Sequence, residues 1–517
     1  MMERKVYGID LGTTNSAIAV FEQGEAQIIK NIDGQEITPS VVLFEGVSSS
    51  GNDETIVGLT AKMAAASNPD NVVQFVKRRM GKSGQVYNFI APSGKEYTPE
   101  MISAFILRKL CQDAEEYEGD GAVKDVVITV PAYFDDARRT ATKQAGAMAG
   151  LNVLTVVNEP TAAAIAYGVD TSKEGKVLVY DLGGGTFDVT VMDINNGRFD
   201  VVATGGDHEL GGLNFDQRLI KLIIEGLEAQ GCDVDDEDDA LMTEIRETAE
   251  VVKKQLSRVE TARPAINVRG KRCKIEIARA AFEKASEDLV SRTQMLLEEV
   301  LNEKRLSWQD IDELLLIGGS TRMPMIKKML ERISGKEVTY KVDPDTAVAR
   351  GAAIYASTFT PALDQGSRSD ERITQNIVVS DVTSQSLGVI SRDPETDRNV
   401  NTIIIPHNTK IPTRRSEIFY TVQDYQTQIK VEVTEGDETE VEFVKIIGHS
   451  LLSIPPHPKG SPIEILFIYD ADQTVAVEVV DKTTNQSLGR FKIERQSNLT
   501  DDQVKNATDI IRKADVE

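Results

Sequence analysis

The pattern of hydrophobic and polar positions divides the chain into two parts of different character. From residue 1 to about 355, short apolar runs rich in β-branched residues alternate with alanine-rich runs of helical length. This alternation is typical of an α/β protein. From Ile377 onward, apolar residues recur at every second position, with turn residues between the runs. That period predicts an antiparallel β-domain ending near Ile493, followed by one short helix after Asn498.

Two strand-helix units show how the first part is built. Residues 126–130 predict a buried strand, and Asp135 is placed to cap the helix that follows it. Residues 153–157 predict the next strand, Pro160 fits the first turn of its helix, and Gly168 is expected to end that helix. Such turns open at the carboxyl ends of strands, where α/β proteins bind their ligands.

Two glycine-rich turns stand in matching strand contexts. The first is Asp10-Leu11-Gly12-Thr13-Thr14-Asn15, and the second is Asp181-Leu182-Gly183-Gly184-Gly185-Thr186-Phe187-Asp188. Glycine lacks a Cβ atom, so backbone N–H groups can converge on a phosphate, and Asp10 and Asp181 suit a hydrated Mg²⁺. The motif G-x-x-x-x-G-K-[ST] is absent, so we expect the phosphates to lie between two hairpins. The pair predicts a duplicated fold with a nucleotide between its halves.

Composition excludes several classes of ligand. The 517 residues suffice for two to four domains, and 40% apolar with 27% charged residues is typical of a soluble globular protein. A net charge of -24 argues against nucleic acid and against anionic membrane surfaces as partners. No run is long enough to span a membrane, and the start lacks a signal-peptide pattern. The three cysteines lack metal-ligand spacing, so we expect a reduced, cytoplasmic location.

Several motifs resemble those of the 70-kDa heat-shock chaperone family, the DnaK-like chaperones, whose ATPase domain has the actin and sugar-kinase fold. The matching motifs are I-D-L-G-T-T-N-S from Ile9, V-P-A-Y-F from Val130, N-E-P-T-A-A-A from Asn158, D-L-G-G-G-T-F-D-V-T from Asp181, G-G-S-T-R-M-P from Gly318 and D-V-T-x-x-S-L-G from Asp381. The last motif lies outside the ATPase half. It therefore favours a chaperone over an actin or a sugar kinase.

The resemblance implies a domain organisation and an activity. The expected parts are an actin-like nucleotide-binding domain at 1–360, a surface segment and apolar linker at 361–381, a β-sandwich substrate-binding domain at 382–496, and a vestigial or truncated helical lid at 497–517. ATP hydrolysis would control the affinity for extended apolar polypeptide. The implied cofactors are ATP or ADP with Mg²⁺, and K⁺ is a further candidate ion. The implied partners are a J-domain co-chaperone and a nucleotide exchange factor.

The resemblance also assigns roles to individual residues. Catalysis is assigned to Lys77, Glu159, Asp181 and Thr186, and metal binding to Asp10, Asp181 and Asp188. Nucleotide binding is assigned to Gly12, Thr13, Thr14, Asn15, Gly183, Gly184, Gly185, Glu250, Lys253, Lys254, Ser257, Gly319, Ser320, Arg322 and Asp345. Coupling is assigned to Pro131, Arg139, Ile377, Val378, Val379 and Asp381, and peptide binding to Phe419, Ile429 and Val431.

Three departures from the family pattern bear on clients and partners. Thr396 to Asn399 stand where the family has an apolar arch over the peptide groove. Thr155 stands where many members have an arginine used by the J-domain protein, and Ser380 replaces a linker leucine. Two alternatives stay open: a small-molecule kinase of the same fold, and a nucleotide-binding regulatory module with a dedicated protein partner.

Overall fold

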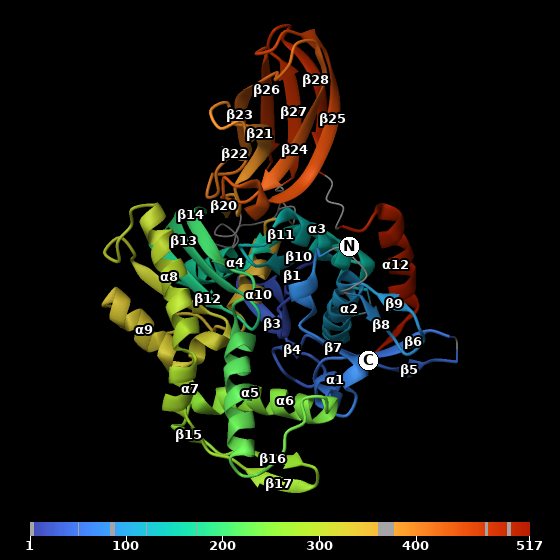
Figure 1. Cartoon of the computed structure of the whole chain (residues 1–517). Helices are drawn as coiled ribbons and strands as arrows, with labels where there is room; N and C mark the ends of the chain where they lie inside the picture. Colours follow the sequence, from blue (N-terminus) through green and yellow to red (C-terminus); the bar gives the residue numbers. More distant parts are fainter. Residues whose placement is uncertain are drawn as a thin grey trace.

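The computed structural model describes residues 5–49, 51–82, 88–119, 121–171, 173–359, 377–470, 474–493 and 498–517. Two α/β lobes form the body of the molecule, and an elongated β-domain stands on top of them (Figure 1). The predicted surface segment that follows residue 360 lies outside the described residues as far as residue 376.

Each lobe is built around one mixed sheet. Lobe I, as we call it, contains the strand order β11-β10-β1-β2-β3, with β4 paired to β2. These strands are β1 (Val6–Asp10), β2 (Asn15–Glu22), β3 (Glu25–Ile29), β4 (Thr38–Pro39), β10 (Asp125–Val130) and β11 (Asn152–Asn158). Lobe II has the order β19-β12-β13-β14-β20, formed by β12 (Gly175–Leu182), β13 (Phe187–Asn195), β14 (Arg198–Asp207), β19 (Glu313–Ile317) and β20 (Val378–Ser380).

The two sheets share one plan, which confirms the predicted duplication. In lobe I, β1, β2 and β3 form an antiparallel meander, and β10 lies parallel to β1. In lobe II, β12, β13 and β14 form the same meander, and β19 lies parallel to β12. Each glycine-rich turn therefore joins the first two strands of its meander.

Helices cover these sheets. Lobe I carries α1 (Leu59–Ala64), α2 (Pro99–Glu118), α3 (Asp136–Met148) and the short helices η1 (Pro69–Asn71) and η2 (Val76–Arg79). Lobe II carries α5 (Gly212–Glu228), α6 (Asp239–Leu256), α7 (Arg279–Ala285), α8 (Glu287–Glu303), η4 (Gly319–Arg322) and α9 (Pro324–Ser334). One apolar cluster joins α4 (Glu159–Thr171) and α10 (Ala347–Ser357) to strands of both sheets. Among the described helices, none has the length and apolar character needed to cross a bilayer.

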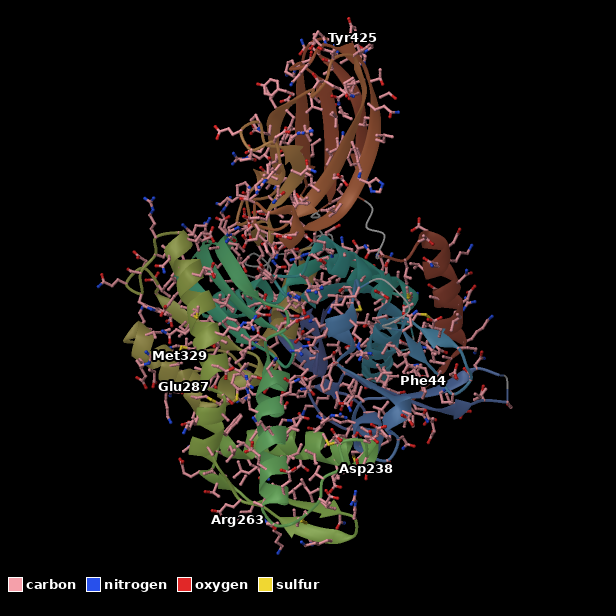
Figure 2. All side chains as sticks on the ribbon, viewed as in Figure 1. Phe44, Asp238, Arg263, Glu287, Met329 and Tyr425 are labelled. Carbon is pink, nitrogen blue, oxygen red and sulfur yellow. A yellow bond between two sulfur atoms is a disulfide. The ribbon has the colours of Figure 1, made fainter. Side chains whose placement is uncertain are left out.

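Small two- and four-stranded sheets complete the lobes. In lobe I, β5 (Val41–Val47), β6 (Asp53–Val57) and β7 (Val72–Gln74) form one sheet, and β8 (Phe89–Ile90) pairs with β9 (Glu96–Tyr97). In lobe II, β15 (Thr261–Ala262) pairs with β18 (Ile277–Ala278), and β16 (Ala265–Val268) pairs with β17 (Lys271–Lys274). Phe44 of β5 lies inside lobe I, whereas Asp238 and Arg263 lie at the far end of lobe II (Figure 2).

Two helix ends were predicted from local sequence signals, and the structure bears out one of them. The Asp135 side chain accepts a hydrogen bond of 3.0 Å from the backbone N–H of Arg138, as predicted for a capping residue. The prediction that Gly168 ends its helix is wrong, because α4 continues to Thr171. Gly168 is instead a packing position: a Cβ atom there would lie 2.9 Å from the Phe199 ring.

The β-domain is a sandwich of two four-stranded antiparallel sheets, as predicted. One sheet contains β22 (Asn399–Ile405), β21 (Leu387–Arg392), β24 (Gln426–Glu435) and β25 (Lys445–His457), and η5 (Val441–Phe443) precedes β25. The other contains β23 (Thr413–Tyr420), β26 (Pro462–Tyr469), β27 (Val475–Asp481) and β28 (Gln486–Lys492). Alternate residues of β26 and β27, including the fully buried Phe467 and Val477, fill the core. In β23 the alternation is reversed, because Ile418 and Tyr420 are exposed and Phe419 packs inward.

The cysteines pair in a way that their spacing did not indicate. Cys232 and Cys273 form a disulfide that joins the end of the α5 region to β17, and Cys111 is a buried free thiol. The acidic residues at 233–238 form a surface loop between α5 and α6, and Arg269 of the turn between β16 and β17 pairs with Asp233 at 2.7 Å.

The C-terminal helix lies on lobe I, beside α3 and α2 (Figure 1). Helix α12 (Asp501–Lys513) buries Ala507 and Ile511 in the lobe I core. After it, β29 (Asp515–Val516) pairs in parallel with β6 and becomes the edge strand of that sheet. Hydrogen bonds flank the pairing, since Val57 N donates to Glu517 O at 2.8 Å and Glu517 N donates to Thr55 O at 2.9 Å.

Neighbouring isoleucines of α12 provide a matched test of this docking. Ile511 is fully buried, whereas Ile510 is 38% exposed. We expect Ile511→Asp to detach the helix, because burying an unpaired carboxylate costs more than about 3 kcal/mol, while Ile510→Asp leaves the helix in place. The measurement is hydrogen exchange at the Val57 amide, because its N–H donates to Glu517 O only while the C-terminal segment is docked. Equal exchange in the two variants would contradict the described docking.

Candidate functional site

The two glycine-rich turns face each other where lobe I meets lobe II, and we call this region between the lobes the cleft. An ideal Cβ atom on Gly184 would lie 2.5 Å from Cγ2 of Thr14, and one on Gly185 would lie 2.6 Å from Cγ2 of Thr13. Any side chain at either glycine would therefore push the turns apart. The sequence prediction that the two hairpins form one site agrees with this geometry.

The second turn presents backbone donors to the cleft. Helix α5 holds the turn from behind, because Gly212 N donates to Gly183 O and Leu213 N donates to Gly184 O, each at 2.9 Å. In the described part of the chain, the N–H groups of Gly184, Gly185 and Thr186 donate to no protein acceptor. Consecutive free N–H groups in a turn form a concave anion site.

Four carboxylates and one lysine line the floor of the cleft. Glu159, Asp181 and Asp188 are buried, and Asp10 is only partly exposed. Lys77 forms a buried ion pair with Glu159, and Thr129 Oγ1 donates to Asp10 Oδ1 at 3.0 Å. One lysine cannot balance four carboxylates. The cleft therefore has an excess of negative charge.

Burial and this excess of negative charge raise the pKa values of the three aspartates. Burial, followed by repulsion from Glu159, raises the pKa of Asp10 and of Asp188 to about 7. The same two causes raise the pKa of Asp181 well above its ordinary value. A bound divalent cation would relieve this repulsion, so the carboxylates fit a metal. Among the described residues, no three acidic, histidine or cysteine side chains converge as direct ligands, which fits a Mg²⁺ ion that keeps most of its waters.

The residues predicted to hold adenosine surround the mouth of the same cleft. Lys253 Nζ donates to Gly212 O at 3.1 Å and pairs with Asp216 at 2.7 Å, directly behind the second turn. Ser320 Oγ donates to Gly183 O at 2.9 Å. On the same short helix as Ser320, Arg322 pairs with Asp345 at 2.7 Å. Sequence reasoning missed Tyr340, whose ring lies 5.6 Å from the Arg322 guanidinium.

Glu250 joins the two lobes instead of standing free for a ligand. Its carboxylate pairs with Lys62 of α1 at 2.6 Å and with Lys254 at 2.7 Å. Burial opposes ionisation, but the two lysines lower the pKa of Glu250 to about 2. Ser257, one turn along α6, donates to Lys253 O at 3.0 Å. Glu250, which was predicted to bind adenosine, thus forms an ion pair between the lobes at the mouth of the cleft.

Comparisons with known proteins agree with this geometry. The family profile described as "Hsp70 protein" matches residues 6–516. The chain belongs to the Hsp70 family. It is 45% identical over 515 residues to the "Chaperone protein DnaK" of Thermotoga neapolitana, covering 96% of this chain and 83% of the relative. It is also 44% identical over 519 residues to the proteins of that name from Thermotoga petrophila and Thermotoga maritima, covering 98% of this chain and 83% of each relative.

Membership of the Hsp70 family confirms the general function predicted from the motifs. The protein is an ATP-dependent chaperone that hydrolyses ATP and uses ATP, ADP and Mg²⁺. Nothing in the comparisons favours the regulatory-module alternative.

A chain of hydrogen bonds leads from the floor of the Hsp70 cleft to the linker. Tyr133 N, in the turn that Pro131 begins, donates to Asp188 Oδ1 at 3.0 Å. The next residue of that turn accepts from Arg139 Nε at 3.1 Å. Arg139 Nη2 donates to Asn158 Oδ1 at 2.5 Å, and Asn158 Nδ2 donates to Asp381 Oδ2 at 2.7 Å. Of the residues predicted to couple the domains, Arg139 and Asp381 are thus joined through Asn158, and Pro131 begins the turn that contacts Asp188.

The linker lies along lobe II as an added strand. Strand β20 pairs in parallel with β14, with Val378 opposite Arg198. Ile377 is buried and Val379 is partly buried in the cluster shared by the two lobes, whereas Val378 is 48% exposed. Only alternate residues of the apolar linker are therefore covered.

The three residues predicted to bind peptide lie on two strands, with Phe419 on β23 of one sheet and Ile429 and Val431 on β24 of the other. Val431 is 2% exposed and belongs to the core. Phe419 and Ile429 are partly buried and pack against that core. Large apolar side chains nearby are exposed, including Tyr425 at the tip of the domain (Figure 2). The loop at 396–399 carries an ion pair, since Arg392 Nε contacts Asp397 Oδ1 at 2.6 Å.

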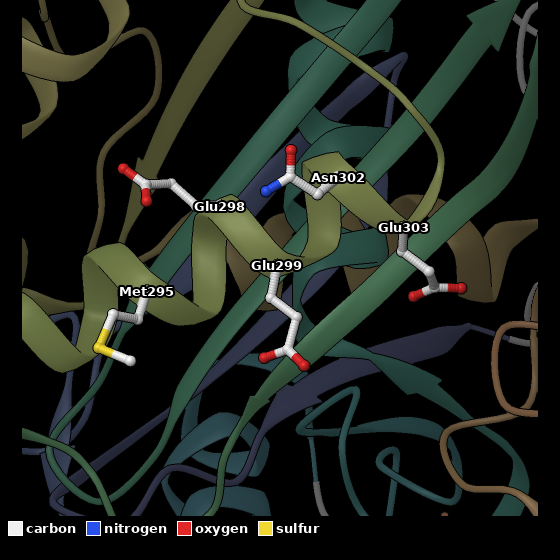
Figure 3. Close-up of a pocket in the computed structure, with 5 residues that line it drawn as sticks. All are labelled: Met295, Glu298, Glu299, Asn302 and Glu303. Atoms are coloured by element: carbon white, nitrogen blue, oxygen red, sulfur yellow. The ribbon is translucent and has the colours of Figure 1, made fainter.

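Loops of the β-domain also contact lobe II directly, which the sequence did not indicate. Asn408 accepts from Thr204 N at 2.9 Å and donates to Thr204 O at 3.1 Å, so its amide acts as an extra partner for β14. His407 lies between Asp437 of its own domain at 2.8 Å and Glu303 of α8 at 3.2 Å. Glu303 is at the end of a shallow acidic hollow along α8, towards the β-domain (Figure 3).

His407 makes domain contact dependent on pH. The hydrogen bond to Asp437, opposed by burial and aided by the charges of Asp437 and Glu303, raises the pKa of His407 to about 9. Asp437 belongs to the same domain as His407, whereas Glu303 adds to the rise in pKa only when the domains touch. The attraction between protonated His407 and Glu303 therefore favours docking, and it is lost as pH rises through about 9. Energy transfer between labels on α8 and β27 should therefore fall between pH 7 and pH 10.

The His407→Gln variant should lose most of that pH dependence. The exposed His449 of β25 supplies the control, since His449→Gln leaves the contact with Glu303 intact. A wild-type profile in the His407→Gln variant would show that another group governs docking.

Proposed function

We propose that this chain binds extended apolar segments of unfolded polypeptides in its β-domain and that nucleotide in the cleft controls their affinity. The single observation that carries the proposal is the hydrogen-bonded path from Asp188 to Asp381. Because the path runs from the cleft floor to the linker, a shift in the position of Asp188 would displace Asp381, and a shift of Asp381 would displace Asp188. The parts assigned to these tasks are the nucleotide-binding domain at 1–360, the linker up to 381, the β-domain at 382–496 and the C-terminal segment at 497–517.

In the cleft, the protein contributes position and charge. The donors of Gly184, Gly185 and Thr186, with Gly12 to Asn15 opposite, would hold the phosphates. Asp10, Asp181 and Asp188 would hold hydrated Mg²⁺, which neutralises phosphate charge when bound. Lys77 would stabilise the transferred phosphoryl group, and Glu159 would orient Lys77 through their ion pair. Phosphoryl transfer requires little more than such positioning.

The residues at the mouth of the cleft would hold the adenosine. Lys253 and Ser257 on one side, with Gly319, Ser320, Arg322 and Asp345 on the other, are the proposed contacts. Glu250 and Lys254 would act mainly by joining the lobes through Lys62. K⁺ is proposed as a second ion, and replacement by Na⁺ tests it.

In the β-domain, Phe419 and Ile429 would line the groove, with Val431 supporting them from the core. An extended client would be recognised through its backbone and one buried apolar side chain. The proposed co-chaperones are a J-domain protein and a nucleotide exchange factor, and the proposed compartment is the cytoplasm. In a reducing cytoplasm, Cys232 and Cys273 would be present mainly as thiols.

Lys77→Ala tests the assignment of the cleft. We expect a loss of about 10² to 10³ in the rate of ATP hydrolysis, because one donor to the transition state is removed. The measurement is single-turnover hydrolysis with and without an extended apolar peptide. Lys327→Ala, on the exposed face of α9, is the matched control. Full activity in Lys77→Ala would refute the assignment of the cleft. If the wild-type protein hydrolyses ATP at the same rate with and without peptide, the result would favour the regulatory module.

Substitutions in the linker test the coupling separately. Val379→Asp should leave basal hydrolysis unchanged but abolish stimulation by peptide, because a carboxylate cannot stay in the cluster that Val379 contacts. Val378→Asp is the control, since Val378 is half exposed on the same strand. Stimulation retained in Val379→Asp would refute linker docking as the means of control.

A further inference from the structure

Arg78, the neighbour of Lys77 on η2, reaches from lobe I into lobe II. Its Nε and Nη2 atoms donate to Gly185 O at 3.0 and 2.7 Å. Nη2 also donates to Glu209 O at 3.1 Å and to Asn214 Oδ1 at 3.0 Å. All three acceptors belong to lobe II. The contacts therefore exist only while the lobes are closed.

With these contacts, all three glycine carbonyls of the second glycine-rich turn accept hydrogen bonds. The carbonyls of Gly183 and Gly184 are held by the first N–H groups of α5, and the carbonyl of Gly185 is held by Arg78. The Gly185–Thr186 peptide bond is trans, so its N–H points away from its carbonyl. When Arg78 holds the carbonyl on one side, the Thr186 N–H is directed to the opposite side, among the free donors.

The charge of Arg78 points to the same role. Its acceptors are two backbone carbonyls and one amide oxygen, all of them neutral. Among the described residues, no carboxylate lies within ion-pair distance of the guanidinium. Burial lowers the pKa of Arg78, while the charges of Glu209 and Asp207 attract the guanidinium from beyond ion-pair distance. The anion site lies one peptide unit away, so a phosphate there would add to this attraction.

We propose that Arg78 is a positioning residue for ATP hydrolysis, which fixes the Gly185–Thr186 peptide so that its N–H faces the terminal phosphate when the lobes close. This inference rests on the proposed assignment of the cleft. Arg78 touches neither nucleotide nor metal in this role; it acts through the turn. Because ADP lacks the terminal phosphate, binding of ADP depends on Arg78 much less than hydrolysis of ATP does.

The test compares Arg78→Ala, Arg78→Lys and Arg79→Ala in the full chain. Arg79 is the matched control, because it is the next residue of η2 and its side chain is exposed. We expect Arg78→Ala to slow single-turnover hydrolysis about 10- to 100-fold, somewhat less than removal of a direct donor, with the dissociation constant of ADP changed less than about threefold. Arg78→Lys should recover only part of the rate, because one ammonium group cannot reproduce the two-pronged contact with Gly185 O.

Each other outcome is decisive. A rate in Arg78→Ala equal to that in Arg79→Ala would overturn the inference. A parallel loss of ADP affinity and thermal stability would also overturn it, since it would mean that Arg78 only holds the fold. Lys77→Ala keeps the two questions apart: if Lys77→Ala is inactive and Arg78→Ala is normal, the inference alone fails. If Lys77→Ala is fully active, the assignment of the cleft fails first.

Discussion

An excess of buried negative charge is the constraint on which the rest of the ATPase half depends. Asp10, Glu159, Asp181 and Asp188 meet at the cleft floor with Lys77 as their one paired cation among the described residues. Two lobes must be brought together to build this floor, because Asp10 comes from β1 and Asp181 from β12. Repulsion among the carboxylates opposes closure, so a cation and closure favour each other. In the proposed assignment, nucleotide with Mg²⁺ would therefore stabilise the closed form as well as serve as the substrate.

Much of this could be predicted from the sequence, because the signals involved are local. The glycine turns, the Asp135 cap and the alternation in β26 and β27 each lie within a few residues, and the structure bears them out. The failures occur where packing against another segment overrides the local signal. Gly168 carries the signal of a helix stop, yet it is needed for packing against Phe199. In β23, an edge strand, period two fixed the alternation but not which face is inside.

The contacts that Arg78, the paired cysteines and α12 make with distant segments could not be predicted. Nothing around Arg78 indicates that it bonds to a turn 107 residues later, and nothing in the spacing of Cys232 and Cys273 indicates their pairing. The pattern after Asn498 predicted one short helix. It did not say that the covering surface is lobe I instead of the β-domain. Such choices depend on the shape of surfaces that exist only after both domains have folded.

The closest link between chemistry and domain contact is a single peptide unit. Glu159 pairs with Lys77 in the cleft, and the residue before it, Asn158, holds Asp381 of the linker. Consecutive Cα atoms across a trans peptide are fixed about 3.8 Å apart, and both residues lie at the junction of β11 and α4. A backbone shift at Glu159 would therefore also displace Asn158. Because Arg139 donates to Oδ1 of the Asn158 amide while its Nδ2 donates to Asp381, such a shift would act on the linker and on the turn after Pro131 together.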